Sequence, residues 1–152
     1  MRWILLLLSA VVPPAFAQTY TGPRPAKPDL PYIRHADHLV PTEAVMAKEE
    51  KKRNEALYTI EGAVSSARTP LVLPVFVLLA DKLNPDSLGL YRLETKGGRR
   101  EVEVGRSNAA IPLEVRNLGG KLYSIETDDA LDPGEYALSP QGTDQVFCFQ
   151  VF

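Results

Sequence analysis

Residues 131–152 read LDPGEYALSPQGTDQVFCFQVF and predict two strands joined by a turn. In the second strand, apolar side chains fill both sets of alternating positions between Val146 and Phe152, interrupted at Gln150. Because successive side chains of a strand point to opposite faces, this strand needs cover on both sides. We therefore expect it to lie centrally in a sheet that packs on a second layer.

Residues 55–127 continue the strand pattern. Short apolar or alternating runs recur there, separated by turns rich in Gly, Asn, Asp and Pro. The clearest hairpin turns are at residues 96–98 and 117–120. Turns spaced roughly 8–12 residues apart are typical of an antiparallel sandwich. The pattern predicts one all-β domain over residues 55–152, an antiparallel β-sandwich of about seven or eight strands.

The stretch Leu131-x-Pro133-Gly134-x-Tyr136 resembles the approach to the penultimate strand of immunoglobulin-like and fibronectin-type domains. In those domains a tyrosine near the strand start sends its hydroxyl back to upstream backbone. The Cys–Trp–Cys pattern of true immunoglobulin domains is missing, since Cys148 is the one cysteine and Trp3 the one tryptophan. The resemblance implies an immunoglobulin-like sandwich architecture and no particular activity.

The first 17 residues have the pattern of a secretory signal peptide. Arg2 precedes an apolar run over residues 3–12, two prolines break it, and Ala15-Phe16-Ala17 forms a small-x-small cleavage site. We expect cleavage after Ala17 and export to a bacterial periplasm or the medium. The apolar run is too short to cross a bilayer, and no later segment is long and apolar enough. We therefore expect no membrane span after cleavage.

Composition excludes some partners. A net charge of −2 offers no basic face for nucleic acid, so none is expected as a ligand. The single cysteine, Cys148, rules out an internal disulfide. Cys148 could be functional, as a reactive thiol or in an intermolecular disulfide. The alternative is that it is a small buried apolar residue. The flanking phenylalanines and the lack of a nearby cationic residue favour the buried interpretation.

Residues 18–54 are expected to precede the β domain as an arm and one short helix. Prolines at positions 23, 25, 28, 31 and 41 favour extended backbone over residues 18–41. Thr42 is a candidate cap for a helix over residues 43–54, whose charges of mixed sign suit a solvated helix surface. The arm would suit contact with an envelope protein partner, or it packs on its own domain.

Candidate chemistry concentrates at His35, Asp37 and His38. Two imidazoles at i and i+3 on one helical turn, with a carboxylate, are ligand types that zinc or copper accepts. The alternative is an exposed polar piece of the arm. Arg99 and Arg100 are expected as solvated charges that protect a sheet edge.

A second acidic group invites a calcium interpretation. Asp128, Asp129 and Asp132 lie close in sequence, but their spacing matches no known calcium loop, which favours a plain acidic turn.

No catalytic motif is present, and in particular no Gly-x-Ser-x-Gly, so enzyme activity is not indicated. The leading hypothesis is a non-enzymatic binding or scaffolding module of the cell envelope. One alternative is a metal-binding protein that uses His35, Asp37 and His38. Another is a hydrolase whose site is assembled across loops, with His35 or His38 beside an acid or hydroxyl.

Overall fold

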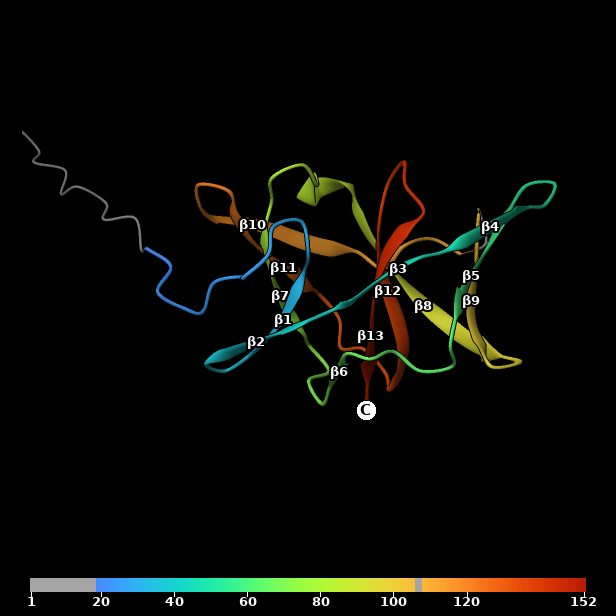
Figure 1. Cartoon of the computed structure of the whole chain (residues 1–152), viewed down its shortest axis with the longest axis horizontal. Coiled ribbons are helices and arrows are strands. Elements are labelled where there is room, and N and C mark those ends of the chain that lie inside the picture. Colours follow the sequence, from blue (N-terminus) through green and yellow to red (C-terminus); the bar gives the residue numbers. More distant parts are fainter. Residues whose placement is uncertain (1–18, 106–107) are drawn as a thin grey trace, which may run out of the picture.

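The computed structural model describes residues 19–105 and 108–152 (Figure 1). The predicted signal peptide, residues 1–17, lies outside the described residues, so cleavage and export stay predictions. The described ranges contain thirteen strands and a single 3-10 turn, η1 (Pro85–Ser87). The predicted all-β antiparallel class is confirmed. No helix in these ranges is long and apolar enough to cross a membrane.

One sheet has five antiparallel strands. In spatial order they are β10 (Leu113–Gly119), β11 (Leu122–Thr127), β7 (Val75–Leu79), β1 (Tyr32–His35) and β2 (His38–Pro41). The predicted hairpin at residues 117–120 joins β10 to β11, and Gly119 and Gly120 both take the positive φ that such a turn requires.

The second sheet has eight strands. In spatial order they are β3 (Glu43–Met46), β13 (Gln145–Val151), β12 (Gly134–Pro140), β8 (Leu88–Lys96), β9 (Arg99–Val104), β5 (Ala56–Glu61) and β4 (Lys48–Lys51), with the short β6 (Arg68–Thr69) parallel to β13. The predicted hairpin at residues 96–98 joins β8 to β9.

This sheet is curled into a half-barrel. Its two edge strands, β3 and β4, follow one another in the chain with only Ala47 between them. β3 pairs with β13, whereas β4 pairs with β5 at the far end of the strand order. One chain segment therefore bridges both ends of the sheet. The described ranges exceed the expected seven or eight strands mainly because residues 32–51, predicted as arm and helix, form β1 to β4.

The curled sheet separates two apolar clusters. Its convex face packs on the five-stranded sheet, where Phe76 meets Phe149 with ring centroids 5.0 Å apart. Its concave face holds a smaller cluster around Ile60, Leu93 and Val102. β13 lies between β12 and β3 and contributes to both clusters. The prediction of a central final strand covered on both faces is confirmed.

The predicted short helix over residues 43–54 is wrong, because this segment forms β3 and β4 (Figure 1). Its backbone pairs with β13 and then with β5, at sites distant in sequence. The Thr42 hydroxyl donates to the Pro31 carbonyl, at 2.7 Å, and caps no helix. Helix propensities differ by only tenths of a kcal/mol between ordinary residues, so two rows of interstrand hydrogen bonds override them.

The predicted arm packs on its own domain. Its second half forms the β1–β2 hairpin, whose Ile33 is fully buried against the core. Its first half is held at Asp29, whose carboxylate accepts hydrogen bonds from the backbone N–H groups of residues 81–83. These bonds lower the pKa of Asp29, although partial burial acts in the opposite direction. Contact between this segment and an envelope partner stays a prediction.

The tyrosine contact expected from the resemblance is present. The Tyr136 hydroxyl donates to the carbonyl of Asp132, four residues upstream, at 2.8 Å. Nη1 of Arg92 donates to the same hydroxyl at 2.9 Å, and Nη2 of Arg92 donates to the Pro133 carbonyl at 3.0 Å. The Tyr136 ring stacks on Phe149. The contact fixes the loop that enters β12.

Candidate functional site

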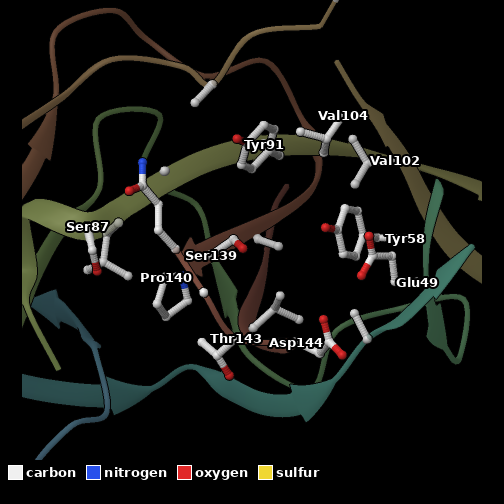
Figure 2. Close-up of a pocket in the computed structure, with 18 of the residues that line it drawn as sticks. Glu49, Tyr58, Ser87, Tyr91, Val102, Val104, Ser139, Pro140, Thr143 and Asp144 are labelled. Carbon is white, nitrogen blue, oxygen red and sulfur yellow. The ribbon is translucent and has the colours of Figure 1, made fainter. Parts of the chain in front are cut away.

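The concave face of the half-barrel carries an open groove of about 570 Å³ (Figure 2). Strands β5, β8, β9, β12 and β13 contribute to its walls, together with the Ala47 bend and the turn at residues 141–144. The Ala47 N–H donates to the Asp144 carbonyl at 2.8 Å, so the bend and the turn are joined at the groove's edge.

The groove exists because some inward positions of two central strands, next to the turn at residues 141–144, are small. On β8 and β12 the outward side chains are large, and Leu90 and Leu138 are fully buried between the sheets. The inward positions include Gly89 and Ser139, which are register partners. A Cβ added at Gly89 would lie 3.2 Å from a ring carbon of Tyr91. Side chains fill the interior of most small barrels, and larger residues at these two positions would fill this groove in the same way.

The floor is apolar and the rim is polar. Ile60, Leu93 and Val102 form part of the floor. At the rim, the phenol rings of Tyr58 and Tyr91 extend into the cavity, and Glu49 lies beside Tyr58 (Figure 2). Neither phenol hydroxyl has a hydrogen-bond partner within the described part of the chain. Burial raises the pKa of Tyr58, and the charges of Glu49 and Asp144 add to the effect, so this hydroxyl stays protonated.

The rim is negative. Glu49, Asp86 and Asp144 line the groove, and none of them forms an ion pair with another described residue. The described lining contains no lysine, arginine or histidine. Carboxylates left without counter-ions around a partly enclosed space create a negative potential within it.

The other end of the half-barrel is closed by a buried arginine. Arg100 is 1% exposed, and its Nη2 lies 2.7 Å from Oε1 of Glu43. Its remaining donors reach the Gly62 carbonyl at 2.8 Å and the Ser65 hydroxyl at 2.7 Å. The prediction of a solvated edge charge is wrong for Arg100, because its side chain shares the inward face of β9 with Val102; Arg99 is exposed as expected.

Glu135 completes this closed end. It is 6% exposed and accepts hydrogen bonds from the backbone N–H and the hydroxyl of Ser65. The second carboxylate oxygen of Glu43 accepts from the Ser66 N–H at 2.6 Å. The loop through Ser65 and Ser66 thus supplies donors to the buried carboxylate of Glu135 and the partly buried one of Glu43.

Cys148 lies fully buried inside the half-barrel and forms no disulfide. Burial raises the pKa of its thiol to about 12, and this outweighs the opposing charge of nearby Arg100. A thiol with so high a pKa is a poor nucleophile. The expectation of a small buried apolar residue is confirmed.

The His35, Asp37 and His38 cluster forms the tip of the β1–β2 hairpin. The two histidines are register partners, with ring centroids 5.4 Å apart. His35 Nε2 lies 3.0 Å from the Thr69 hydroxyl, and His38 Nδ1 lies 3.2 Å from Asp37. Partial burial and the charge of His38 lower the pKa of His35. The structure brings both rings together on a hairpin and not on the expected helical turn.

No group of three or more histidine, cysteine or acidic side chains within residues 19–105 and 108–152 is arranged to hold a metal ion. Zinc or copper binding at His35 and His38 therefore stays a prediction that rests on two imidazoles. Asp128 and Asp129 are exposed, and Asp132 contributes its carbonyl to Tyr136, as a plain acidic turn would. Neither histidine lines the groove, so the hydrolase alternative stays a hypothesis that depends on the pairing of His35 with Thr69.

Sequence reasoning missed the groove. A usable signal was present: on β12, large Tyr136 and Leu138 alternate with small Ala137 and Ser139. Comparison of the chain with protein-family models, with curated proteins and with solved structures gives no match. Function therefore has to be inferred from the chemistry of the groove itself.

Proposed function

We propose that the chain is an exported, non-enzymatic binding module that holds a small ligand in the groove of its half-barrel. The observation that carries this proposal is an open space of about 570 Å³ with an apolar floor and a polar rim. Small-molecule sites typically measure about 300–1,000 Å³ and combine apolar walls with a few polar groups. A concave face that served only stability would be filled by larger side chains.

The side chains that line the groove favour ligand binding over catalysis. Its described lining offers carboxylates, hydroxyls and phenols, without an imidazole to activate the hydroxyls of Ser87 or Ser139. The thiol of Cys148 is buried and protonated.

Export is supported by the pattern of residues 1–17, and sequencing the N terminus of the chain from culture fractions tests it: the first residue should be Gln18. The Tyr136–Asp132 contact supports an immunoglobulin-like style for the sandwich.

The binding proposal is tested by recording amide NMR spectra of residues 18–152 with a panel of neutral, cationic and anionic fragments. Shifts should cluster on Gly89, Ala137 and Gly142. They should disappear in Ser139→Trp, and in the milder Ser139→Leu, both of which place a large side chain in the groove. Ala130→Trp, on an exposed loop, is the matched control and should leave them in place. Shifts scattered over the surface, or unchanged by the groove variants, would refute a ligand site here.

A second proposal is favoured by the paired rings of His35 and His38, 5.4 Å apart between centroids. These imidazoles would bind zinc or copper, separately from the groove. A calorimetric zinc or copper signal that is lost in His35→Ala with His38→Ala would support it.

A further inference from the structure

We infer that the groove selects an organic cation with an apolar tail, a ligand of the alkylammonium class. This inference rests on the proposed binding function and adds the charge and shape of the ligand. Three features of the groove carry it: carboxylates without counter-ions, two phenol faces, and an apolar floor beside them.

The first feature is charge. Glu49 and Asp144 line the same side of the groove as Tyr58 (Figure 2), and neither has a cationic partner among the described residues. An ammonium group about 4 Å from one carboxylate gains about 1 kcal/mol in bulk water and more where the walls exclude solvent. An anion in the same place would be repelled to a similar extent. The rim therefore distinguishes ligands by the sign of their charge.

The second feature is the pair of tyrosines. Tyr58 and Tyr91 present their rings to the cavity (Figure 2), and the hydroxyl of Tyr58 stays protonated. The face of an aromatic ring attracts a cation by about 0.5–1 kcal/mol at exposed sites and more when the cation is desolvated. The phenols and the carboxylates thus favour the same kind of head group at the same end of the groove.

The third feature separates an organic cation from a metal ion. Small inward residues, Gly89, Ala137 and Ser139, leave room above an apolar floor that includes Leu93 and Val102. A bare metal ion would use none of this surface, and the described residues contain no cluster of three ligands for one. An alkyl chain would cover it and gain about 25 cal/mol for each Å² of apolar surface removed from water. A ligand that contacts both the negative rim and the apolar floor is therefore a cation with a hydrocarbon tail.

Calorimetry with three probes of equal chain length tests the inference on residues 18–152. They are octylammonium, octan-1-ol and octanoate, each kept below the concentration at which it aggregates. Octylammonium should bind at least about tenfold more tightly than octan-1-ol, and octanoate should bind most weakly. Ser139→Trp and Ser139→Leu should abolish binding of all three.

Charge-neutralising variants sharpen the test. Glu49→Gln combined with Asp144→Asn should weaken octylammonium about tenfold and leave octan-1-ol unchanged. The matched control, Asp128→Asn with Asp129→Asn, removes two exposed carboxylates elsewhere and should change neither. Tyr58→Phe keeps the ring and should bind octylammonium nearly as the parent does, whereas Tyr58→Leu should weaken it several-fold.

The outcomes separate this inference from the proposed function. If octan-1-ol binds as tightly as octylammonium and the Ser139 variants block both, the groove binds ligands without selecting charge and the inference fails alone. Tightest binding of octanoate would refute it in the same way. If none of the probes shifts the groove amides while other fragments do, the inference again fails alone. If no fragment of any charge shifts them, the inference and the proposed function fail together.

Discussion

The two ends of the half-barrel use the same kind of side chain in opposite ways. At the closed end, Glu43 is held by Arg100 and the Ser66 N–H, and Glu135 is held by the N–H and hydroxyl of Ser65. At the open end, Glu49 and Asp144 stand at the rim of a cavity with no cation beside them among the described residues. Buried carboxylates need partners within the fold, whereas carboxylates at an open rim are solvated and remain available to a ligand. The first pair is structural, and the second is the pair we connect with binding.

The largest expected effect comes from removing part of the layer that covers the convex face of the half-barrel. Deleting residues 18–41 takes away β1 and β2, two of the five strands of that layer, together with the buried Ile33, so the truncated chain should not fold cooperatively. The single change Ile33→Ala should lower the free energy of unfolding by about 2–5 kcal/mol, because Ile33 is fully buried. Urea unfolding followed by circular dichroism measures both. A truncated chain with dispersed amide signals would contradict this prediction and show that residues 42–152 fold without the segment before them.

The next largest effect should break the closed end alone. Arg100→Met leaves the partly buried Glu43 without its cation and removes the donor to the Ser65 hydroxyl, and should cost about 3–5 kcal/mol of unfolding free energy. Arg99→Met, its exposed neighbour on β9, should change stability by no more than about 0.5 kcal/mol. Chemical denaturation measures both changes. Equal losses of unfolding free energy in the two variants would mean that the Arg100–Glu43 ion pair does not stabilise the closed end.

Replacing a carboxylate by an amide at each end of the half-barrel should affect stability differently. Glu135→Gln should destabilise by about 1–3 kcal/mol, because a buried charged acceptor is replaced by a weaker one. Glu49→Gln with Asp144→Asn should change stability by no more than about 0.5 kcal/mol, since both residues are exposed. Thermal unfolding at fixed pH distinguishes them. A large loss in the rim variant would assign a structural role to the open end as well.

Cys148 predicts a pH dependence with a definite sign. Its pKa is about 12 in the folded chain and near 9.0 when exposed, so the unfolded state loses its proton first as pH rises. The thiol's contribution to stability is therefore complete below pH 9 and declines by up to about 1.4 kcal/mol per pH unit above it. The difference in unfolding free energy between the parent and Cys148→Ala should shrink between pH 8 and 10. A difference independent of pH would contradict the burial of this thiol.

The smallest expected effect concerns the hairpin tip. Zinc or copper added to residues 18–152 should give a weak calorimetric signal, because two imidazoles lie together there and the described residues add no third ligand. His35→Ala with His38→Ala should remove it, and Asp128→Asn serves as a control. The absence of heat at micromolar metal would end the metal hypothesis and leave the groove as the binding region under test.

Local patterns in the sequence were sufficient for several features. Successive side chains of a strand point to opposite faces of its sheet. The strand at residues 146–151 is apolar on both faces, so its sequence alone predicts a position covered on both sides. Paired glycines predict the turns at residues 97–98 and 119–120, because only glycine adopts positive φ at no steric cost. The Tyr136 contact spans four residues and is equally local. By itself the sequence therefore determined the all-β class, two hairpins and the cover on the last strand.

Tertiary structure decided the rest, and the reason is distance along the chain. The charged run at residues 48–53 has no strong local preference, so its pairing partner β5 settles its conformation. Arg100 is buried because Glu43 and Ser65 reach it from far upstream. The groove arises only when β8 and β12 place Gly89 opposite Ser139 inside a curled sheet. These contacts join residues that are far apart in sequence and form only when the chain folds. No local sequence pattern therefore predicts them.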